Sequence, residues 1–190
     1  KYIKTKYAIK MDSDISFKNS VIDKFLQTAS YVKDFIILAP QHEKNFYKPD
    51  FLSKYKSRFK NLQLMKLIHG QFIFLNMKNV KKVGYYDENF FLYFEEADLC
   101  KRISINGGKV FCSSKLFINH LGYKGSISTD PKYEIESEMI RSWHWMWSTF
   151  YYNKKYKGFL VSLVKILPKL VSSITKYLFF LVLRNNEKKN

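Results

Sequence analysis

Short apolar runs flank one amphipathic segment at the start of the chain. Tyr7–Met11 form an apolar run that ends at the triplet Asp-Ser-Asp, which predicts a strand with carboxylates at its C-terminal end. Apolar residues between Val21 and Ala29 recur at helical spacing and predict a helix. A second strand is predicted over residues 35–39, where the apolar run stops at Pro40. Strand, helix and strand in this order indicate an α/β domain.

The next part of the chain alternates irregular and regular segments. Residues 41–61 are polar and aromatic without a clear period, so we expect an irregular excursion there. Residues 71–77 predict a strand, and residues 78–83 predict a short helix that ends at Gly84.

A further helix is predicted over residues 96–105 by its charge distribution. Acidic residues lie at its start and two basic residues near its end, which matches the helix dipole, and Asn-Gly-Gly then terminates it. Short strands are predicted over residues 109–112 and 116–119, and the second places His120 at its end.

The character of the sequence changes after residue 130. Residues 133–152 predict a helix rich in aromatic residues, and residues 154–183 predict an amphipathic tail with lysines on one face and aliphatic side chains on the other. The longest apolar run of this tail, residues 177–183, is far shorter than the roughly 20 residues that a membrane span requires. We therefore expect the tail to lie on a membrane surface or against protein.

The chain carries a large positive charge. Its 33 Lys and Arg residues against 16 Asp and Glu give a formal net charge of +17, which predicts attraction to an anionic partner. The lysines are dispersed, so compositional bias of the source genome explains the excess equally well, and no nucleic-acid partner is expected because no RNA or DNA motif is present. Cys100 and Cys112 lack metal-type spacing, which favours a reducing, cytoplasmic compartment.

Asp12 and Asp14 are separated by one residue at the predicted end of a strand. Strand periodicity points two such carboxylates in the same direction, so they can share one divalent cation. The pattern also occurs often by chance, and a loop that only caps the following helix is the alternative. His120 is a structural residue when taken alone. Beside such a site it becomes a candidate third ligand, because neutral imidazole suits Mn better than Ca.

Glu95, Glu96 and Asp98 follow an aromatic run. One acidic residue suffices at a helix N-terminus, and Asp98 lies four residues before Arg102, which assigns Asp98 to support of the helix. Two adjacent glutamates behind Phe-Phe-Leu-Tyr-Phe are harder to explain structurally, since an apolar wall raises the pKa of a carboxyl group. A raised pKa suits a general base.

One long run is similar to a known family. Residues 84–126 resemble the second half of the catalytic domain of family 2 glycosyltransferases, in particular the bacterial rhamnosyltransferase-like branch. Their sequence is GYYDENFFLYFEEADLCKRISINGGKVFCSSKLFINHLGYKGS. The shared pattern has an acidic pair, Asp-Leu-Cys-x-Arg, a Gly-rich turn and a later His before Gly and Ser. The Asp-x-Asp strand of that family resembles KYAIKMDSDIS, and Gly70 matches a small residue before its acceptor-side strand.

The resemblance implies an α/β fold of the GT-A type, a Rossmann-like nucleotide-diphospho-sugar transferase, here as a partial domain with C-terminal amphipathic helices. By position, Asp12 and Asp14 become the pair that binds a divalent metal, Mn or Mg, on the donor diphosphate. Asp14 is favoured as the direct ligand, and His120 would complete the metal site.

The same resemblance assigns the remaining candidate residues. Glu96 falls where the family places its catalytic base, commonly an Asp, and Glu95 is the alternative. Lys154 and Lys155 are candidate further contacts to the donor diphosphate, although a solvated basic run is the competing interpretation.

The resemblance, which covers roughly residues 5–160, and the amphipathic pattern of the tail together imply how the chain is organised. Residues 1–130 correspond to the C-terminal portion of a GT-A catalytic domain, residues 131–156 to an aromatic and basic helical segment, and residues 157–190 to an amphipathic tail. Family members carry further strands and helices before the Asp-x-Asp pair. We therefore expect the chain to be a fragment of a longer gene product or a degenerate form, and the isolated chain could lack activity.

Together these features predict an inverting glycosyltransferase of cell-surface polysaccharide synthesis. It would move a sugar from a nucleotide-diphosphate sugar to a hydroxyl of a glycan or lipid-linked saccharide. The basic amphipathic tail predicts a peripheral location on the anionic inner face of the cell membrane. The alternatives are a non-catalytic, membrane-associated remnant of a transferase and, less favoured, a basic nucleic-acid-binding module.

Overall fold

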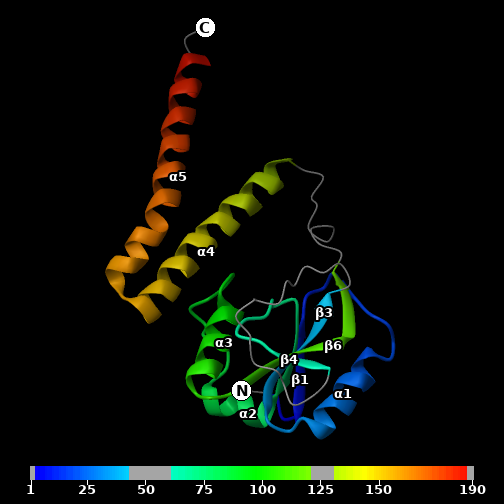
Figure 1. The fold of residues 1–190 in the computed structure, drawn as a ribbon. Helices are drawn as coiled ribbons and strands as arrows, with labels where there is room; N and C mark the ends of the chain where they lie inside the picture. The colour runs from blue at the N-terminus through cyan, green and yellow to red at the C-terminus, as the bar shows by residue number, and fades with distance from the viewer. Residues whose placement is uncertain (1–2, 43–60, 121–130, 188–190) are drawn as a thin grey trace. The chain divides into compact units, whose positions relative to one another are not determined.

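The described part of the chain is a mixed α/β protein. The structure is a computed structural model, which describes residues 3–42, 61–120 and 131–187. These residues form a mixed sheet of six strands and five helices (Figure 1). The α/β class expected from the sequence is confirmed.

The described residues divide into two compact units. The α/β unit contains the described residues up to Asp87 together with residues 95–120. The helical unit contains Glu88–Phe94 together with residues 131–187. The aromatic run that precedes Glu95 in the sequence therefore belongs with the C-terminal helices and not with the sheet.

The α/β unit is built on a sheet with the strand order β1-β5-β3-β6-β2, in which β4 also pairs with β6. The pair β3–β6 is parallel and the other strand pairs are antiparallel. Its elements in chain order are β1 (Tyr7–Met11), β2 (Ile15–Ser16), α1 (Val21–Tyr31), β3 (Phe35–His42), β4 (Leu62–Leu64), β5 (Phe72–Asn76), α2 (Met77–Val83), α3 (Glu95–Ile105) and β6 (Lys109–His120).

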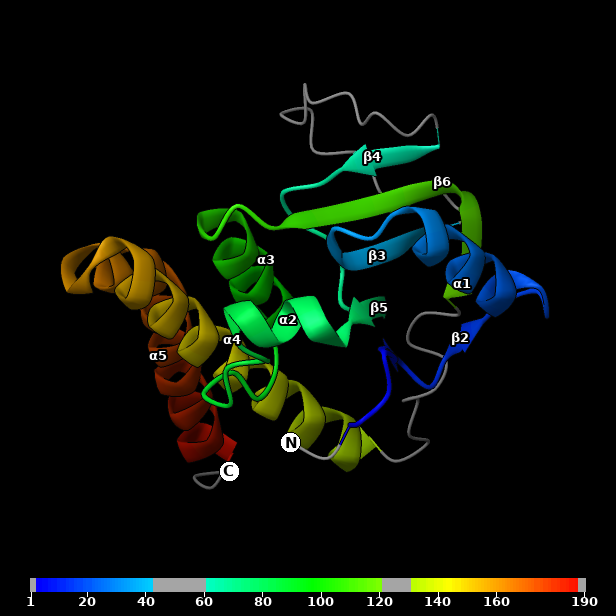
Figure 2. The same cartoon turned by 90° about the horizontal axis from the view of Figure 1, so that it is seen from below.

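Helices cover both faces of this sheet, with α1 on one face and α2 and α3 on the other (Figure 2). All five residues of the interior strand β5 are buried, because successive side chains of a strand point to opposite faces and both faces are covered. Phe72 and Phe74 pack in the core under α1, whereas Ile73 and Leu75 pack in the core under α2 and α3. A strand buried on both faces reads as a continuous apolar run, which is why the sequence predicts it well.

Most of the predicted elements of the α/β unit are confirmed. The first strand has the expected bounds, and the predicted helices correspond to α1, α2 and α3, with α3 beginning one residue early at Glu95. Gly84 follows α2 with φ of 84°, a conformation that glycine adopts without strain. Of the predicted irregular excursion, residues 41 and 42 belong to β3, and residues 43–60 lie outside the described part of the chain.

Two predicted strand boundaries are wrong. Pro40 does not end its strand, since β3 continues to His42, and residues 109–120 form one strand, not two. Both errors have one cause: the pairing of β3 with β6 shifts register between Pro40 and Gln41. Such an irregularity accommodates a residue without an N–H and takes up the extra residues of β6 opposite it.

The helical unit contains two long helices. α4 (Pro131–Lys157) and α5 (Phe159–Glu187) are separated by Gly158, which has φ of 90°. Residues 88–94 pack on α4: the indole of Trp147 donates to Asn89 O at 3.1 Å, and the hydroxyl of Ser148 donates to Leu92 O at 2.7 Å. The predicted helices therefore exist, but the first extends to Lys157 and the break falls at the glycine.

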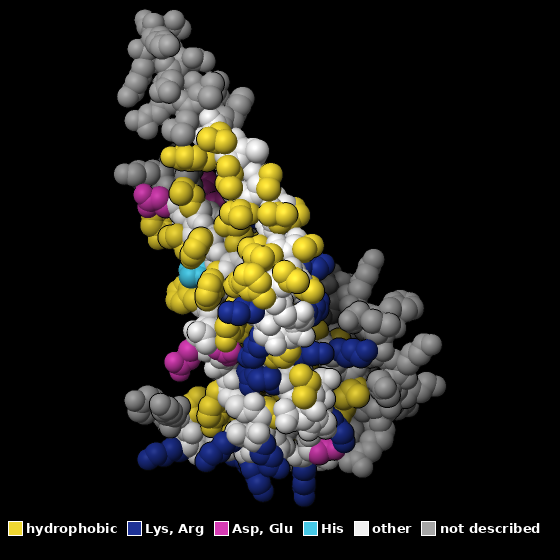
Figure 3. Space-filling view, turned by 90° about the vertical axis from the view of Figure 1, so that its left-hand side faces the viewer, with side chains coloured by type: hydrophobic (Ala, Val, Ile, Leu, Met, Phe, Trp, Pro, Cys, Tyr) yellow, Lys and Arg dark blue, Asp and Glu magenta, His cyan; other side chains and the backbone are white. Residues whose placement is uncertain are grey.

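An apolar face of α5 is left exposed. Ser162 is fully buried on α5, whereas Leu160 and Val164 have 76% and 69% of their surface exposed. Hydrophobic side chains line the helices in the space-filling view (Figure 3), and the exposed ones on α5 are Phe159, Leu160, Val161, Leu163, Val164, Leu167, Leu170, Val171, Ile174, Tyr177 and Leu178. Helix α5 therefore turns a small polar position inward and leaves much of its apolar stripe uncovered within its unit.

Candidate functional site

The acidic pair lies where the sequence predicts it, just after β1. The backbone N–H of Asp12 donates to Gln71 O at 2.9 Å, which ties the end of β1 to the residue before β5. The chain then turns, with Ile15 N–H donating to Asp12 O, and enters the short strand β2. Because ligands of α/β sheets bind beyond the carboxyl ends of strands, this position suits a site.

Strand β2 brings His120 to the acidic pair. It pairs with the end of β6, where Ile15 lies opposite His120. His120 Nε2 consequently lies 3.1 Å from Asp14 Oδ2. The sequence placed His120 at a strand end, but the two-residue strand that delivers it was not predicted, since two residues are too few to show a periodic pattern.

Asp12, Asp14 and His120 have the arrangement of a cation site. One potential ligand atom from each lies within 4.8 Å of the others, and all three residues are half-buried. The two carboxylate oxygens suit Mn or Mg, and the imidazole nitrogen favours the more borderline ion, so the three residues fit Mn better than Mg. The structure thus brings together the three residues predicted as ligands.

Gln71 supports the imidazole from its other side. Its Nε2 lies 3.4 Å from His120 Nδ1. A ligating imidazole usually donates its second ring N–H to an acceptor, so with a cation on Nε2 the Gln71 amide would present its oxygen, not its nitrogen, to Nδ1. Gln71 was not singled out from the sequence, where nothing marks it apart from its position next to Gly70.

A second acidic group lies at the start of α3, beside Gly70. A Cβ atom at Gly70 would lie 3.6 Å from both Glu95 Oε1 and Glu96 Oε2, and 3.4 Å from Lys10 Nζ. The two glutamates and the lysine therefore border one small space that the missing side chain of Gly70 leaves open. Lys10 also contacts Asp12, with Nζ 2.8 Å from Asp12 Oδ1. The lysine thus touches the cation triad and borders the glutamate pair.

Burial and like charge perturb the glutamate pair. The pKa of Glu96 is raised from 4.5 to about 7, first by burial and then by the negative charge of Glu95, while the positive charge of Lys10 opposes the shift. Glu95 Oε2 is buried without a hydrogen-bond partner. Burial is also the main reason that the pKa of the Tyr86 hydroxyl is raised, with Glu95 and Glu96 adding to it. A carboxyl group with a pKa near neutrality is suited to accept a proton.

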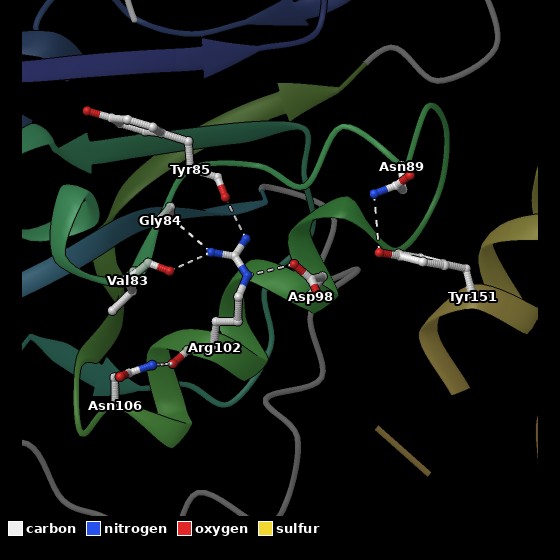
Figure 4. A network of polar contacts seen from close by, with 8 residues as sticks. All are labelled: Val83, Gly84, Tyr85, Asn89, Asp98, Arg102, Asn106 and Tyr151. Carbon is white, nitrogen blue, oxygen red and sulfur yellow. Dashed lines mark hydrogen bonds and ion pairs between the residues drawn. The ribbon is translucent and has the colours of Figure 1, made fainter. Parts of the chain in front are cut away.

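Asp98 has the structural role predicted for it. It is fully buried and accepts a hydrogen bond from Arg102 Nε at 2.7 Å (Figure 4). The same guanidinium donates to backbone carbonyls of the turn after α2, at Val83, Gly84 and Tyr85. This network fastens α3 to the preceding turn and so fixes the start of the helix, where Glu95 and Glu96 lie.

The two predicted lysines of α4 belong to the helical unit. Lys155 Nζ lies 5.6 to 6.0 Å from the ring centres of Phe90, Tyr151 and Tyr156. These are cation–π distances, so Lys155 has a packing role within its own unit. The same unit holds the hydrogen bond from Asn89 Nδ2 to the Tyr151 hydroxyl (Figure 4). Contact of Lys154 or Lys155 with a diphosphate stays a prediction.

Comparison with known proteins adds no assignment. No protein-family model matches the chain, and no curated protein matches its sequence. The resemblance to family 2 glycosyltransferases therefore rests on the motifs themselves. Among the described residues, no helix is both long enough and apolar enough to cross a membrane.

Proposed function

We propose that the chain belongs to an inverting glycosyltransferase of the GT-A type. The observation that carries the proposal is the convergence of two acidic groups in one unit: the triad of Asp12, Asp14 and His120, and the pair Glu95 and Glu96, with Lys10 between them. A sugar transfer from a nucleotide-diphosphate donor needs both a cation for the leaving diphosphate and a base for the acceptor hydroxyl.

The triad supports the donor half of the reaction. A Mn or Mg ion held by Asp12, Asp14 and His120 would supply Lewis-acid stabilisation of the leaving diphosphate. Asp14 and His120 are the less exposed ligands, with side chains 19% and 22% accessible against 39% for Asp12. Gln71 holds the imidazole ring in place through its contact with Nδ1.

The glutamate pair supports the acceptor half. Glu96, whose pKa is about 7, would take the proton from the acceptor hydroxyl as that oxygen attacks the anomeric carbon. Glu95 is the second carboxylate of the pair, and its charge helps to hold the pKa of Glu96 up. The acceptor is a hydroxyl of a glycan or of a lipid-linked saccharide.

We further propose that α5 binds the anionic inner face of the cell membrane. The exposed apolar stripe of α5 is accompanied by exposed lysines, among them Lys165 and Lys169. Apolar side chains enter the region of the lipid headgroups, while lysines near the surface contribute about 1 kcal/mol each with anionic lipid. This surface would keep the enzyme beside a lipid-linked acceptor.

Metal-dependent donor binding tests the proposal. In the gene product that contains this sequence, Asp14→Ala should abolish Mn-dependent binding of a nucleotide-diphosphate sugar, measured by calorimetry over a panel of such sugars. Asp23→Ala is the matched control, since Asp23 is an exposed aspartate of α1. Donor binding that survives Asp14→Ala would count against the metal site. Lipid binding without any donor binding would favour the non-catalytic remnant.

A further inference from the structure

Lys10 occupies the junction of the two acidic groups. Its Nζ donates hydrogen bonds to Asp12 Oδ1 and to the backbone carbonyl of Gly70. Lys10 lies in β1 and Asp12 directly follows that strand, so the alternation of an extended chain turns both side chains, two residues apart, to the same side. Nζ and the two glutamates also border the open space at Gly70. The ammonium group is therefore bound to one acidic group and lies next to the other.

The contact with Asp12 conflicts with cation binding. A divalent cation held by the triad would use a carboxylate oxygen of Asp12, and Lys10 already donates to Oδ1 of that group. Two positive centres a few ångströms apart also repel each other. Even where the cation takes the other oxygen, Oδ2, this repulsion weakens the hold of the ammonium group on Asp12.

The glutamate pair offers the ammonium group a second position. Lys10 Nζ, Glu95 Oε1 and Glu96 Oε2 all lie within 3.6 Å of the point that a Cβ of Gly70 would occupy. Rotation of its flexible stem can carry the ammonium group of Lys10 from Asp12 to the glutamate oxygens, without movement of the backbone. Glu95 Oε2, buried without a partner, is an acceptor that such a movement can satisfy.

From this arrangement we infer that Lys10 is a mobile internal counter-cation, which leaves Asp12 for the Glu95–Glu96 pair when a divalent cation binds the triad. The inference rests on the cation site of the proposed function. Lys10 acts through the residues it contacts, so it is a positioning residue. The negative charge of the glutamates then raises the affinity of the triad for the cation, because it draws Lys10 away from Asp12. Because linkage is reciprocal, cation binding in turn favours the contact of Lys10 with the glutamates.

Removal of Lys10 should therefore tighten cation binding. The full chain is titrated with Mn²⁺ alone, and electron paramagnetic resonance measures the concentration of the free ion. The Lys10→Met variant should bind Mn²⁺ roughly two- to tenfold more tightly, since it loses an ion pair that competes with the cation. Lys10→Gln, which keeps a polar side chain, should behave alike, whereas Lys10→Arg, which keeps the charge, should retain the original affinity. Lys24→Met is the control, because Lys24 is an exposed lysine on α1. Unchanged or weaker binding by both neutral variants would overturn the inference.

A double-mutant cycle tests the coupling to the glutamates. Glu96→Gln should weaken Mn²⁺ binding several-fold at a pH above the pKa of Glu96, and this effect should shrink markedly in the Lys10→Met background. Equal effects in both backgrounds would mean direct attraction between Glu96 and the cation and would overturn the role of Lys10. If the unsubstituted chain binds Mn²⁺ no better than Asp14→Ala, the cation site of the proposed function fails as well. If the unsubstituted chain binds the ion and Lys10→Met changes nothing, only the present inference fails.

Discussion

His120 Nε2 lies 3.1 Å from Asp14 Oδ2, although the two residues come from the far ends of the α/β unit in the sequence. The contact exists because β2 follows the acidic pair directly and pairs with the last residues of β6. We predict that His120→Ala weakens Mn²⁺ binding at least tenfold, and that Gln71→Leu, which removes the support of the ring, weakens it less. Calorimetry measures both effects. His144→Ala is the control for loss of a histidine elsewhere, and equal affinity of all variants would exclude His120 as a ligand.

Glu96 should make stability depend on pH. Its pKa of about 7 in the folded chain exceeds its ordinary value of 4.5, so the folded state binds this proton more tightly than the unfolded state. Stability is therefore lost as the pH rises from about 4.5 to about 7. Glu96→Gln removes this loss and should stabilise the chain by about 1 to 3 kcal/mol at pH 8, and by little at pH 4.

Urea unfolding at both pH values checks this prediction. The side chains that act on the pKa of Glu96 are Glu95 and Lys10, whose charges salt screens, so all variants are compared in the same buffer and salt. Glu134→Gln, an exposed glutamate of α4, serves as the control. A gain in stability that is the same at both pH values would contradict the shifted pKa.

Loss of Arg102 should destabilise the α/β unit. Arg102→Ala leaves Asp98 as a fully buried carboxylate without its ion pair, and it frees three carbonyls of the turn after α2. Breaking a buried pair in this way costs about 3 to 5 kcal/mol. Lys101→Ala, at an exposed neighbouring position of the same helix, should change the unfolding free energy little. A loss below about 1 kcal/mol for Arg102→Ala would mean that the network does not hold α3 in place.

The exposed stripe of α5 should control membrane binding. Val164→Asp places a charge in the apolar stripe at a position that does not pack in its unit, so the helix should fold while flotation with vesicles containing anionic lipid falls at least tenfold. Leu26→Asp, at an exposed apolar position of α1, is the matched control.

The lysines of the same helix give an independent arm of that experiment. Lys165→Glu and Lys169→Glu should each weaken binding several-fold at low salt, and the effect should fade at high salt. Undiminished flotation of Val164→Asp and both lysine variants would exclude α5 as the membrane-binding surface.

The sequence predicts those elements whose burial is regular. Strand β5 and helices α1 and α3 show clear apolar or charge patterns because each packs against the core along most of its length. Strands β2 and β4 are too short for a pattern. The polar residues Ser113, Ser114 and Lys115 resemble a break in β6, yet Ser113 pairs with Leu62 of β4 and the strand continues.

The sequence predicts the acidic residues of the site better than it predicts the residues that lie beside them. Asp12, Asp14 and His120 carry chemistry that their residue types suggest, and the structure brings them together. Lys10 could have been found from strand alternation, which places it on the face of Asp12, but a lysine in a basic chain attracts no notice. The resemblance marks Gly70 only as a small residue, because its position beside Glu95 and Glu96 of a distant helix is not visible in any local pattern.

Sugar transfer by the gene product that contains this sequence tests the central claim most directly. With Mn²⁺, a panel of nucleotide-diphosphate sugars and a lipid-linked saccharide as acceptor, product formation is followed by mass spectrometry. We predict that the unsubstituted protein transfers sugar and that Glu96→Gln lowers the turnover rate by a factor of about 10² to 10⁴, while Glu134→Gln leaves it unchanged. Transfer that proceeds at the same rate after Glu96→Gln, or no transfer from any donor of the panel, would contradict the account.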